Sequence, residues 1–208
     1  MSSQSGSLSP RKVSIRVGGA AGDGIASVAE TLAKACSRQG LYVFAYNSYQ
    51  SVIRGGHINM QLRIGSKKVW SQGDFCDFLV ALNLDTVKRH AKEITPGGGV
   101  IYNKEKIKMD PGQVPQGVND FGIPASAIAG KFGKSPIMQN TVALGALTCL
   151  MNFPFETISE VIADTFKKKG EAVVTANVGA ARRVLTTPKR ISKKWNSPGT
   201  SQSKGGCS

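Results

Sequence analysis

A glycine-rich segment, GGAAGDG at residues 18–24, is the first part of the sequence whose residue types could do chemistry. It lies between a run of alternating apolar and polar residues and a segment with helical spacing, where phosphate-binding loops lie in α/β proteins. Its pattern, Gly19-x-x-Gly22-x-Gly24, reverses the intervals of the G-x-G-x-x-G fingerprint, and no Lys-Ser or Lys-Thr pair completes a Walker A loop. Asp23 also places a negative charge where a bound anion would lie. Three interpretations stay open: nucleotide binding, tight turns with close packing, and contact with a partner subunit or mobile substrate.

A second segment, SYQSVIRGGH at residues 48–57, joins two predicted strands. It should therefore lie at the carboxyl end of a strand, where α/β proteins bind ligands. Arg54 offers a planar guanidinium to phosphate or carboxylate, and the backbone N–H groups of Gly55 and Gly56 could face an anion or another chain. His57 could titrate near neutral pH. Because no carboxylate or nucleophile adjoins this histidine in sequence, we expect a structural or interface role for it ahead of a catalytic one.

The remaining polar motifs have plainer interpretations. Asn140 and Thr141 fall near a predicted helix start, where capping the helix is the simplest role. Gly145 and Ala146 in the same helix would let another helix approach closely. His90 ends a Lys-Arg-His run, for which we expect a solvent-exposed helix face. No Ser–His–Asp set or pair of catalytic carboxylates stands out, so the chain alone does not look like a complete enzyme.

The cysteines and the hydropathy pattern exclude several classes of protein. No two cysteines have C-x-x-C spacing, so we expect no metal ion or iron–sulfur cluster on this chain. Buried thiols suit a reducing compartment. No apolar run reaches the roughly 18–20 residues of a membrane span, and the N-terminus does not look like a secretory signal. We therefore expect a cytoplasmic protein without a membrane span. The four cysteines are Cys36, Cys76, Cys149 and Cys207.

The charge is concentrated at the two ends of the sequence. Lys+Arg number 27 against 13 Asp+Glu, for a formal net charge of +14, and residues 188–208 are basic with no acidic residue. Both ends are poor in apolar residues, so we expect disordered segments at 1–12 and 188–208 around one domain at 13–187. A basic tail can bind nucleic acid or an anionic surface. Because no aromatic or zinc element accompanies the charge, we expect a solvated tail instead.

The pattern of apolar residues predicts a three-layer, Rossmann-like α/β fold with a mostly parallel sheet and C-terminal helices. The first strand, helix and second strand form a βαβ unit, for which we expect a parallel strand pair with a right-handed crossover. The run at 78–82 is fully apolar, as is typical of a central parallel strand. A turn is expected at 96–99. Strands are predicted at 13–17, 41–46, 58–64, 78–82, 100–102 and 118–123, and helices at 25–38, 84–94, 124–132, from 136, 154–169 and 171–185.

Four segments in this order, GGAAGDGI, YQSVIRGGH, DFLVALN and NTVALGA, resemble the gamma subunit or gamma domain of the 2-oxoacid:ferredoxin oxidoreductases. That family includes pyruvate, 2-oxoglutarate, ketoisovalerate and indolepyruvate types, and the second segment is most similar to the 2-oxoglutarate type. The resemblance implies a non-autonomous subunit that works with alpha and beta, and in some enzymes delta, partners. The whole enzyme would decarboxylate a 2-oxoacid, form an acyl-CoA and pass electrons to ferredoxin.

The resemblance also implies where the cofactors lie. Thiamine diphosphate, Mg²⁺ and the iron–sulfur clusters would sit on the partner chains, and this chain alone would bind no cofactor. Its gamma domain would contribute to the coenzyme A side of the reaction. Two alternatives remain: a stand-alone nucleotide-binding protein, and a basic protein that binds nucleic acid or an anionic surface. No catalytic residue is assigned. The candidate cofactor-binding residues are Gly19, Gly22, Gly24, Ser51, Arg54, Gly55, Gly56, His57 and Asn140.

Overall fold

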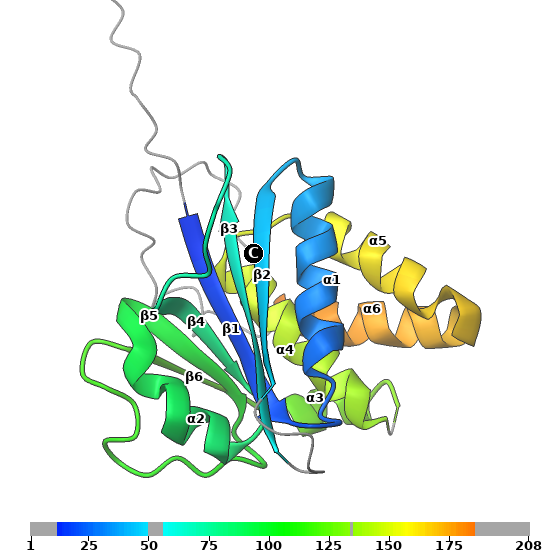
Figure 1. The fold of residues 1–208 in the computed structure, drawn as a ribbon. Coiled ribbons are helices and arrows are strands. Elements are labelled where there is room, and N and C mark those ends of the chain that lie inside the picture. The colour runs from blue at the N-terminus through cyan, green and yellow to red at the C-terminus, as the bar shows by residue number, and fades with distance from the viewer. Residues whose placement is uncertain (1–11, 50–55, 134, 186–208) are drawn as a thin grey trace, which may run out of the picture.

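The computed structural model describes residues 12–49, 56–133 and 135–185, and these form one mixed sheet with helices on both faces (Figure 1). Both terminal segments predicted to be disordered lie outside the described residues, apart from Lys12. That residue begins the first strand and so belongs to the domain. Ser51, Arg54 and Gly55 also lie outside the described residues.

The sheet has six strands in the order β2-β3-β1-β4-β5-β6. Strands β1, β4, β5 and β6 pair in parallel, whereas β3 is antiparallel to both of its neighbours. The predicted α/β class with a mostly parallel sheet is therefore confirmed. The strands span Lys12–Ala20 (β1), Tyr42–Tyr49 (β2), His57–Gly65 (β3), Cys76–Ala81 (β4), Ile94–Asn103 (β5) and Asn119–Ile123 (β6).

The predicted β1–β2 pair is parallel in direction but not adjacent, so that part of the prediction is wrong. Strand β3 lies between the two and pairs with each, as shown by the partners Val17↔Met60 and Asn47↔Met60. Strand β3, which has a strand on both sides, is almost entirely buried. The strand predicted at 41–46 extends further, because β2 continues to Tyr49.

The turn predicted at 96–99 is instead a bulge inside β5. The pairing of β5 with β4 shifts from Cys76↔Ile94 to Phe78↔Gly99, so four residues of β5 lie opposite Asp77 alone. That carboxylate fixes the bulge: it accepts a hydrogen bond from Thr95 Oγ1 at 3.0 Å and one from the backbone N–H of Ser14 at 2.8 Å. The glycines permit the bend, and Gly97 has φ +84°.

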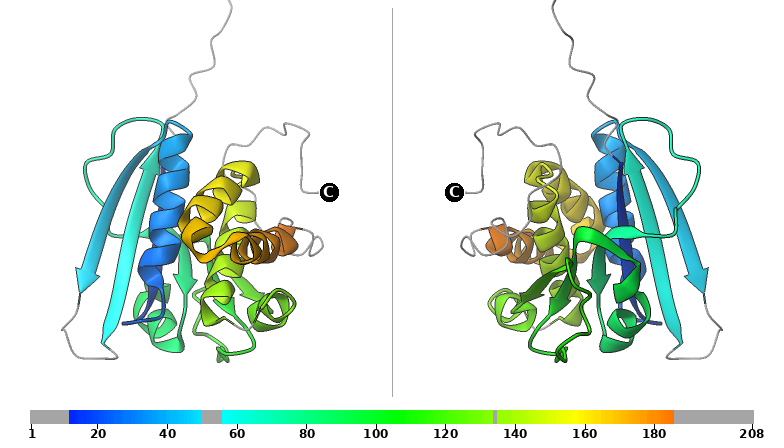
Figure 2. Two further views of the ribbon diagram at one scale, coloured as in Figure 1. Left: turned by 90° about the vertical axis from the view of Figure 1, so that its right-hand side faces the viewer. Right: turned by 90° about the vertical axis from the view of Figure 1, so that its left-hand side faces the viewer.

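Helices cover the sheet unequally, as Figure 2 shows. The larger core lies on the face that packs against α1 and the four C-terminal helices, and the smaller core lies under α2 on the opposite face. None of the helices in the described residues is long and apolar enough to cross a membrane. The helices span Ile25–Arg38 (α1), Leu84–His90 (α2), Ala125–Gly130 (α3), Pro136–Leu150 (α4), Phe155–Phe166 (α5) and Glu171–Leu185 (α6), with short 3-10 turns at Ala91–Glu93 and Lys167–Lys169.

Candidate functional site

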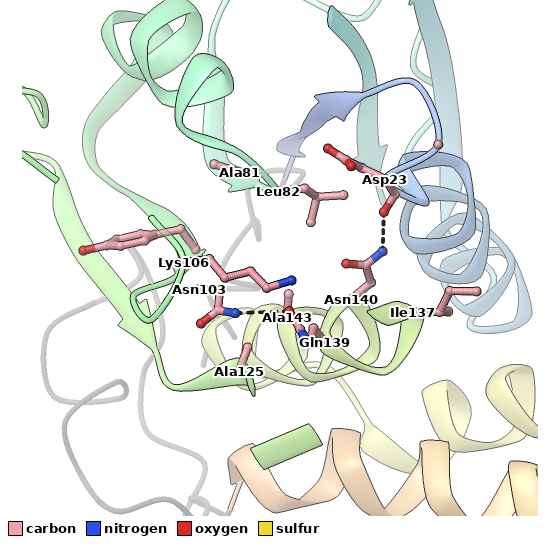
Figure 3. Close-up of a pocket in the computed structure, with 12 residues that line it drawn as sticks. Asp23, Ala81, Leu82, Asn103, Lys106, Ala125, Ile137, Gln139, Asn140 and Ala143 are labelled. Carbon is pink, nitrogen blue, oxygen red and sulfur yellow. Dashed lines mark hydrogen bonds between the residues drawn. The ribbon is translucent and has the colours of Figure 1, made fainter. Parts of the chain in front are cut away.

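A cavity of about 150 Å³ lies at the carboxyl edge of the sheet, where the parallel strands β1, β4 and β5 end against α4 (Figure 3). Open α/β sheets bind ligands at this edge, because the strand ends and the following loops converge there. Its lining combines apolar side chains with amide groups, Asp23, Tyr102 and one lysine. Its lining residues are Gly22, Asp23, Ala81, Leu82, Tyr102, Asn103, Lys106, Ala125, Ile137, Gln139, Asn140 and Ala143.

The glycine loop that borders the cavity is held together by hydrogen bonds between Asp23 and Ala20. Asp23 Oδ2 accepts a hydrogen bond from the backbone N–H of Ala20 at 2.7 Å, and the N–H of Asp23 donates back to the Ala20 carbonyl at 3.0 Å. Gly22 and Gly24 have φ +99° and +85°, the left-handed region that glycine occupies without strain. A side chain at Gly19 would collide with the Asp23 carboxylate. This geometry favours the tight-turn interpretation of the loop over nucleotide binding, because the carboxylate lies where a phosphate would have to lie.

Asn140 links the glycine loop to α4. Its Nδ2 donates to the backbone carbonyl of Asp23 at 2.6 Å, and it would also contact any side chain placed at Gly24. The capping role expected for Asn140 and Thr141 is wrong, because α4 begins at Pro136 and both residues lie after its first turn. Asn140 therefore positions the loop from the side of the helix, and it lines the cavity as well.

Three polar residues of the cavity were not among the sequence candidates. Asn103 Nδ2 donates to Gln139 Oε1 at 3.2 Å and to Ser126 Oγ at 2.8 Å, which holds the end of β5 against α3 and α4. The side chain of Lys106 extends across the cavity in Figure 3. Lys106 is exposed and forms no ion pair with any residue that the structure describes. Its position shortly after β5, which ends at Asn103, is the signal that the sequence offers for it.

The second sequence segment contacts the glycine loop through Gly56 at the carboxyl edge of the sheet. The side chain of His57 nevertheless faces away from the cavity. The carbonyl of Gly56 accepts a hydrogen bond from the backbone N–H of Ala21 at 3.1 Å, and His57 pairs with Ala20 across β3 and β1. The His57 side chain is 2% exposed and lies against α2, on the opposite face of the sheet from α4. It therefore does not line the cavity.

His57 belongs to a polar cluster beneath α2. Its Nε2 lies 2.8 Å from Nε2 of His90, and Nδ1 of His90 lies 2.8 Å from a guanidinium nitrogen of Arg16. The exposed position expected for His90 is thus wrong, because its side chain is only 13% exposed. Arg16 also contacts Glu93 and donates to Gln61 Oε1. None of His57, His90 and Arg16 lines the cavity described above.

Electrostatics favour the neutral form of both histidines. Burial and, to a smaller extent, the nearby Arg16 guanidinium lower the pKa of His90 to about 4. Burial also lowers the pKa of His57, although the Asp85 carboxylate partly opposes this. Burial lowers the pKa of Arg16 as well. A pair of neutral rings can share one N–H between the two Nε2 atoms, which a pair of imidazolium rings cannot do.

The described residues contain no group of side chains that could bind a metal ion or an iron–sulfur cluster. No group of three or more His, Cys, Asp or Glu side chains there converges on one point. Cys36 and Cys76 are fully buried, and burial raises the pKa of each thiol to about 12. Thiolates are the ligands of such centres, so these two residues do not fit an iron–sulfur cluster.

Comparisons with known proteins identify the family. Residues 14–187 match the family described as pyruvate ferredoxin/flavodoxin oxidoreductase. The chain is 26% identical to the 2-oxoglutarate synthase subunit KorC of Archaeoglobus fulgidus, over 88% of this chain and 95% of that one. It is 31% identical to the ketoisovalerate oxidoreductase subunit VorA of Methanothermobacter thermautotrophicus, over 80% of this chain but only 34% of the relative.

Solved structures give the same result. A 2-oxoglutarate:ferredoxin oxidoreductase from Magnetococcus marinus, solved with 2-oxoglutarate, coenzyme A and succinyl-CoA bound, has a TM-score of 0.78 and 34% identity. The match covers 89% of this chain and 32% of that one. The pyruvate oxidoreductase subunit PORC from Thermotoga maritima has a TM-score of 0.70 and 26% identity, over 84% and 95% of the two chains.

These lengths distinguish two kinds of relative. The chain spans nearly the whole length of KorC and PORC, and about a third of VorA and of the Magnetococcus chain. The family predicted from the four sequence segments is confirmed. The chain belongs to the pyruvate ferredoxin/flavodoxin oxidoreductase family and matches the separate subunits KorC and PORC over nearly their whole lengths.

Proposed function

We propose that this chain is the gamma subunit of a 2-oxoglutarate-type enzyme and contributes the cavity beside the glycine loop to the binding of coenzyme A. The enzyme would remove CO₂ from the 2-oxoacid, join the remaining acyl group to the thiol of coenzyme A, and pass the two released electrons to ferredoxin. The observation that carries the proposal is the lysine in that cavity: Lys106 lies at the carboxyl edge of the sheet with no ion-pair partner among the described residues. The Magnetococcus neighbour, which was solved with coenzyme A, supports the choice of ligand.

The cavity suits one anionic group rather than a whole cofactor. Its volume of about 150 Å³ accepts a phosphate or a short stretch of pantetheine. The Lys106 ammonium would pair with a phosphate, and the amide groups of Asn103 and Asn140 would orient it. The Asp23 carboxylate stays engaged with its own loop, so it would repel a phosphate from the glycines and favour a position nearer to Lys106. Ser51, Arg54 and Gly55, which lie outside the described residues, remain candidates for the rest of the cofactor.

Mg²⁺ and iron–sulfur clusters do not fit the residues of this chain that the structure describes. No acidic or thiol group there is gathered for a metal ion or a cluster. We propose that these groups are held by the alpha and beta partners, with delta as a further partner in some enzymes, and that the complex works in the cytoplasm. On its own the gamma subunit would then have no oxidoreductase activity.

The test uses the complete enzyme. The full chain is co-expressed with its alpha and beta partners, and 2-oxoacid oxidation is followed with ferredoxin as acceptor. Lys106→Gln should raise the KM for coenzyme A about tenfold and leave the KM for 2-oxoglutarate unchanged, because a charge-assisted contact to one substrate has been removed. Lys104→Gln is the matched control, since Lys104 is exposed nearby and does not line the cavity.

Two results would overturn the proposal. Turnover of a 2-oxoacid by the isolated chain would contradict its role as a dependent subunit. A complex that forms and turns over 2-oxoglutarate, but in which Lys106→Gln and Lys104→Gln have the same KM for coenzyme A, would contradict the role of the cavity.

A further inference from the structure

Exposed aromatic side chains gather on one flank of the molecule. Tyr42 and Tyr46 on β2 are 51% and 47% exposed, and Trp70 and Phe75 in the loop after β3 are 76% and 60% exposed. They account for every strongly exposed aromatic side chain in the part of the chain that the structure describes. We call these four residues the aromatic flank. Large apolar side chains gathered on one surface mark an interaction site, whereas scattered ones do not.

Strand β2 lacks the features that normally protect a sheet edge. It lies at the end of the sheet, and its eight residues, YVFAYNSY, include no charged residue and no proline. Edge strands that stay in solvent are usually short, charged or interrupted by proline. Strand β6 at the other edge follows this rule, because it has five residues and carries Asp120. The contrast indicates that β2 is covered when the protein is assembled.

The flank lies on the side of the sheet that the large helical layer leaves open. Alternation along β2 places Tyr42 and Tyr46 on the same face as Arg16, Gln61 and α2, away from α1 and α4. Figure 2 shows β2 and β3 extending beyond α2 on this side, with no helix over them.

The loop that carries the other two aromatic residues is held in place. The buried Gln61 donates from Nε2 to the backbone carbonyls of Gln72, Gly73 and Phe75, at 3.0, 3.1 and 3.2 Å. Lys68 Nζ stands 4.2 Å over the ring of Trp70. The aromatic side chains are therefore presented on an ordered surface, and binding would not have to order the backbone first.

The charges beside the flank define the chemistry of its partner. Residues 39–49 and 56–76 contain Arg63, Lys67 and Lys68 against the single acid Asp74, and Lys12 lies beside Gly65. A second copy of this chain would bring like charges together on the same flank, which costs binding energy. A partner surface with an apolar centre and an acidic rim would match it.

We propose that the aromatic flank is the docking surface for the alpha polypeptide of the enzyme. The inference rests on the function proposed above. In VorA and in the Magnetococcus structure, the part similar to this chain is about a third of a longer chain, so the rest of that chain is a permanent neighbour. The flank is also continuous with the candidate site: β2 ends and β3 begins at the edge where Gly56 bonds to the glycine loop. A polypeptide docked here therefore borders that edge.

The test compares variants of the full chain in the complex. Tyr42→Ser combined with Tyr46→Ser should weaken the affinity for the alpha–beta partners about tenfold, because central aromatic residues carry most of the energy of an interface. Lys67→Glu combined with Lys68→Glu should weaken it about threefold at low salt and less at high salt. The matched control is Lys167→Glu combined with Lys168→Glu, an exposed lysine pair at the far end of α5, which should stay within about twofold of wild type. Thermal unfolding of each variant checks that it is folded.

The outcomes separate this inference from the proposed function. The docking surface is wrong if the wild-type chain binds alpha and beta and the flank variants bind them as tightly as the control does. That result leaves the proposed function unaffected. Wild-type chain that binds no alpha partner overturns both. Flank variants that abolish self-association of this chain, with alpha binding unchanged, would assign the flank to a second copy and overturn the inference.

Discussion

His57 and His90 lie with their Nε2 atoms 2.8 Å apart, although one begins a strand and the other ends a helix. Nδ1 of His90 lies 2.8 Å from the Arg16 guanidinium, which can only donate, and 3.2 Å from Glu93 Oε2, which can only accept; we assign Nδ1 as the acceptor from Arg16 because that contact is the shorter. The proton of His90 is then on Nε2 and is donated to Nε2 of His57. This leaves the proton of His57 on Nδ1, which is buried and faces Asp85 Oδ2 at 3.7 Å, beyond hydrogen-bond distance.

This pair predicts a loss of stability at mildly acidic pH. The pKa of His90 is lowered from 6.5 to about 4 in the folded protein, and that of His57 is also lowered. The unfolded chain binds protons below pH 6.5 while the folded chain does not. The free energy of unfolding should therefore fall as pH drops from 6.5 toward 4, by up to about 1.4 kcal/mol per pH unit for His90, and His57 contributes in the same direction.

Urea unfolding across this pH range, with His90→Gln as the comparison, measures the effect. The variant loses the contribution of His90, so its free energy of unfolding should fall less steeply than that of wild type. The surrounding charges of Arg16, Arg89, Asp85 and Glu93 are present in both proteins, so the comparison isolates the replacement of His90. Parallel pH profiles for the two proteins would contradict a lowered pKa of His90.

The carboxylate of Asp23 should stabilise the glycine loop through its bond to the N–H of Ala20. Asp23→Ala leaves that N–H without its acceptor and should lower the free energy of unfolding by about 1–3 kcal/mol. Asp23→Asn keeps an oxygen in the same place and should cost clearly less. Urea unfolding compares the two variants, and hydrogen exchange of the Ala20 amide reports on the bond itself. Equal stability of both variants would show that the carboxylate does not hold the loop.

The order of the elements and the edge that holds the site were predictable from the sequence. Alternating and helical periodicities depend on local chain geometry, so the positions of α1 and β4 followed from them. The insertion of β3 between β1 and β2 did not, because strand pairing is a non-local choice.

The site was predictable in part, for a related reason. The glycine loop and Gly56 come together because both lie at strand ends, which the pattern of elements indicated. Lys106 and Asn103 were missed because their role depends on where β5 ends relative to α4. His90 was placed in solvent because nothing in the local sequence reveals that Arg16 lies next to it.

Two buried cysteines should be inert in the folded protein. Burial raises the pKa of the Cys36 and Cys76 thiols to about 12, so almost no thiolate is present near neutral pH. A variant with Cys149→Ser and Cys207→Ser retains only these two. A thiol reagent such as DTNB should label both within minutes in denaturant and neither on that timescale in the folded protein. Rapid labelling of the folded variant would contradict the burial of these side chains.

Gly145 should be intolerant of even one added methyl group. The close helix approach predicted at this residue is confirmed, because a Cβ there would lie 2.3 Å from the carbonyl oxygen of Ala181 on α6. Alanine favours a helix over glycine by about 1 kcal/mol. Overpacking against backbone that cannot rotate away costs about 1–3 kcal/mol. The second effect should win because the obstacle is the main chain of α6, so Gly145→Ala is expected to lower the free energy of unfolding by about 1–2 kcal/mol.

Gly130→Ala provides the matched control for that substitution. Gly130 also lies in a helix, but a Cβ there meets no atom within 4 Å, so only the gain from replacing glycine remains. It should be neutral or stabilise the protein by up to about 1 kcal/mol. The free energies of unfolding of both variants in urea show whether the helix propensity of alanine or its collision with α6 has the larger effect at Gly145. Equal stability of Gly145→Ala and Gly130→Ala would show that α4 and α6 are not in backbone contact at Gly145. The packing of the C-terminal helices, which supports Asn140 in the cavity, would then have to be revised.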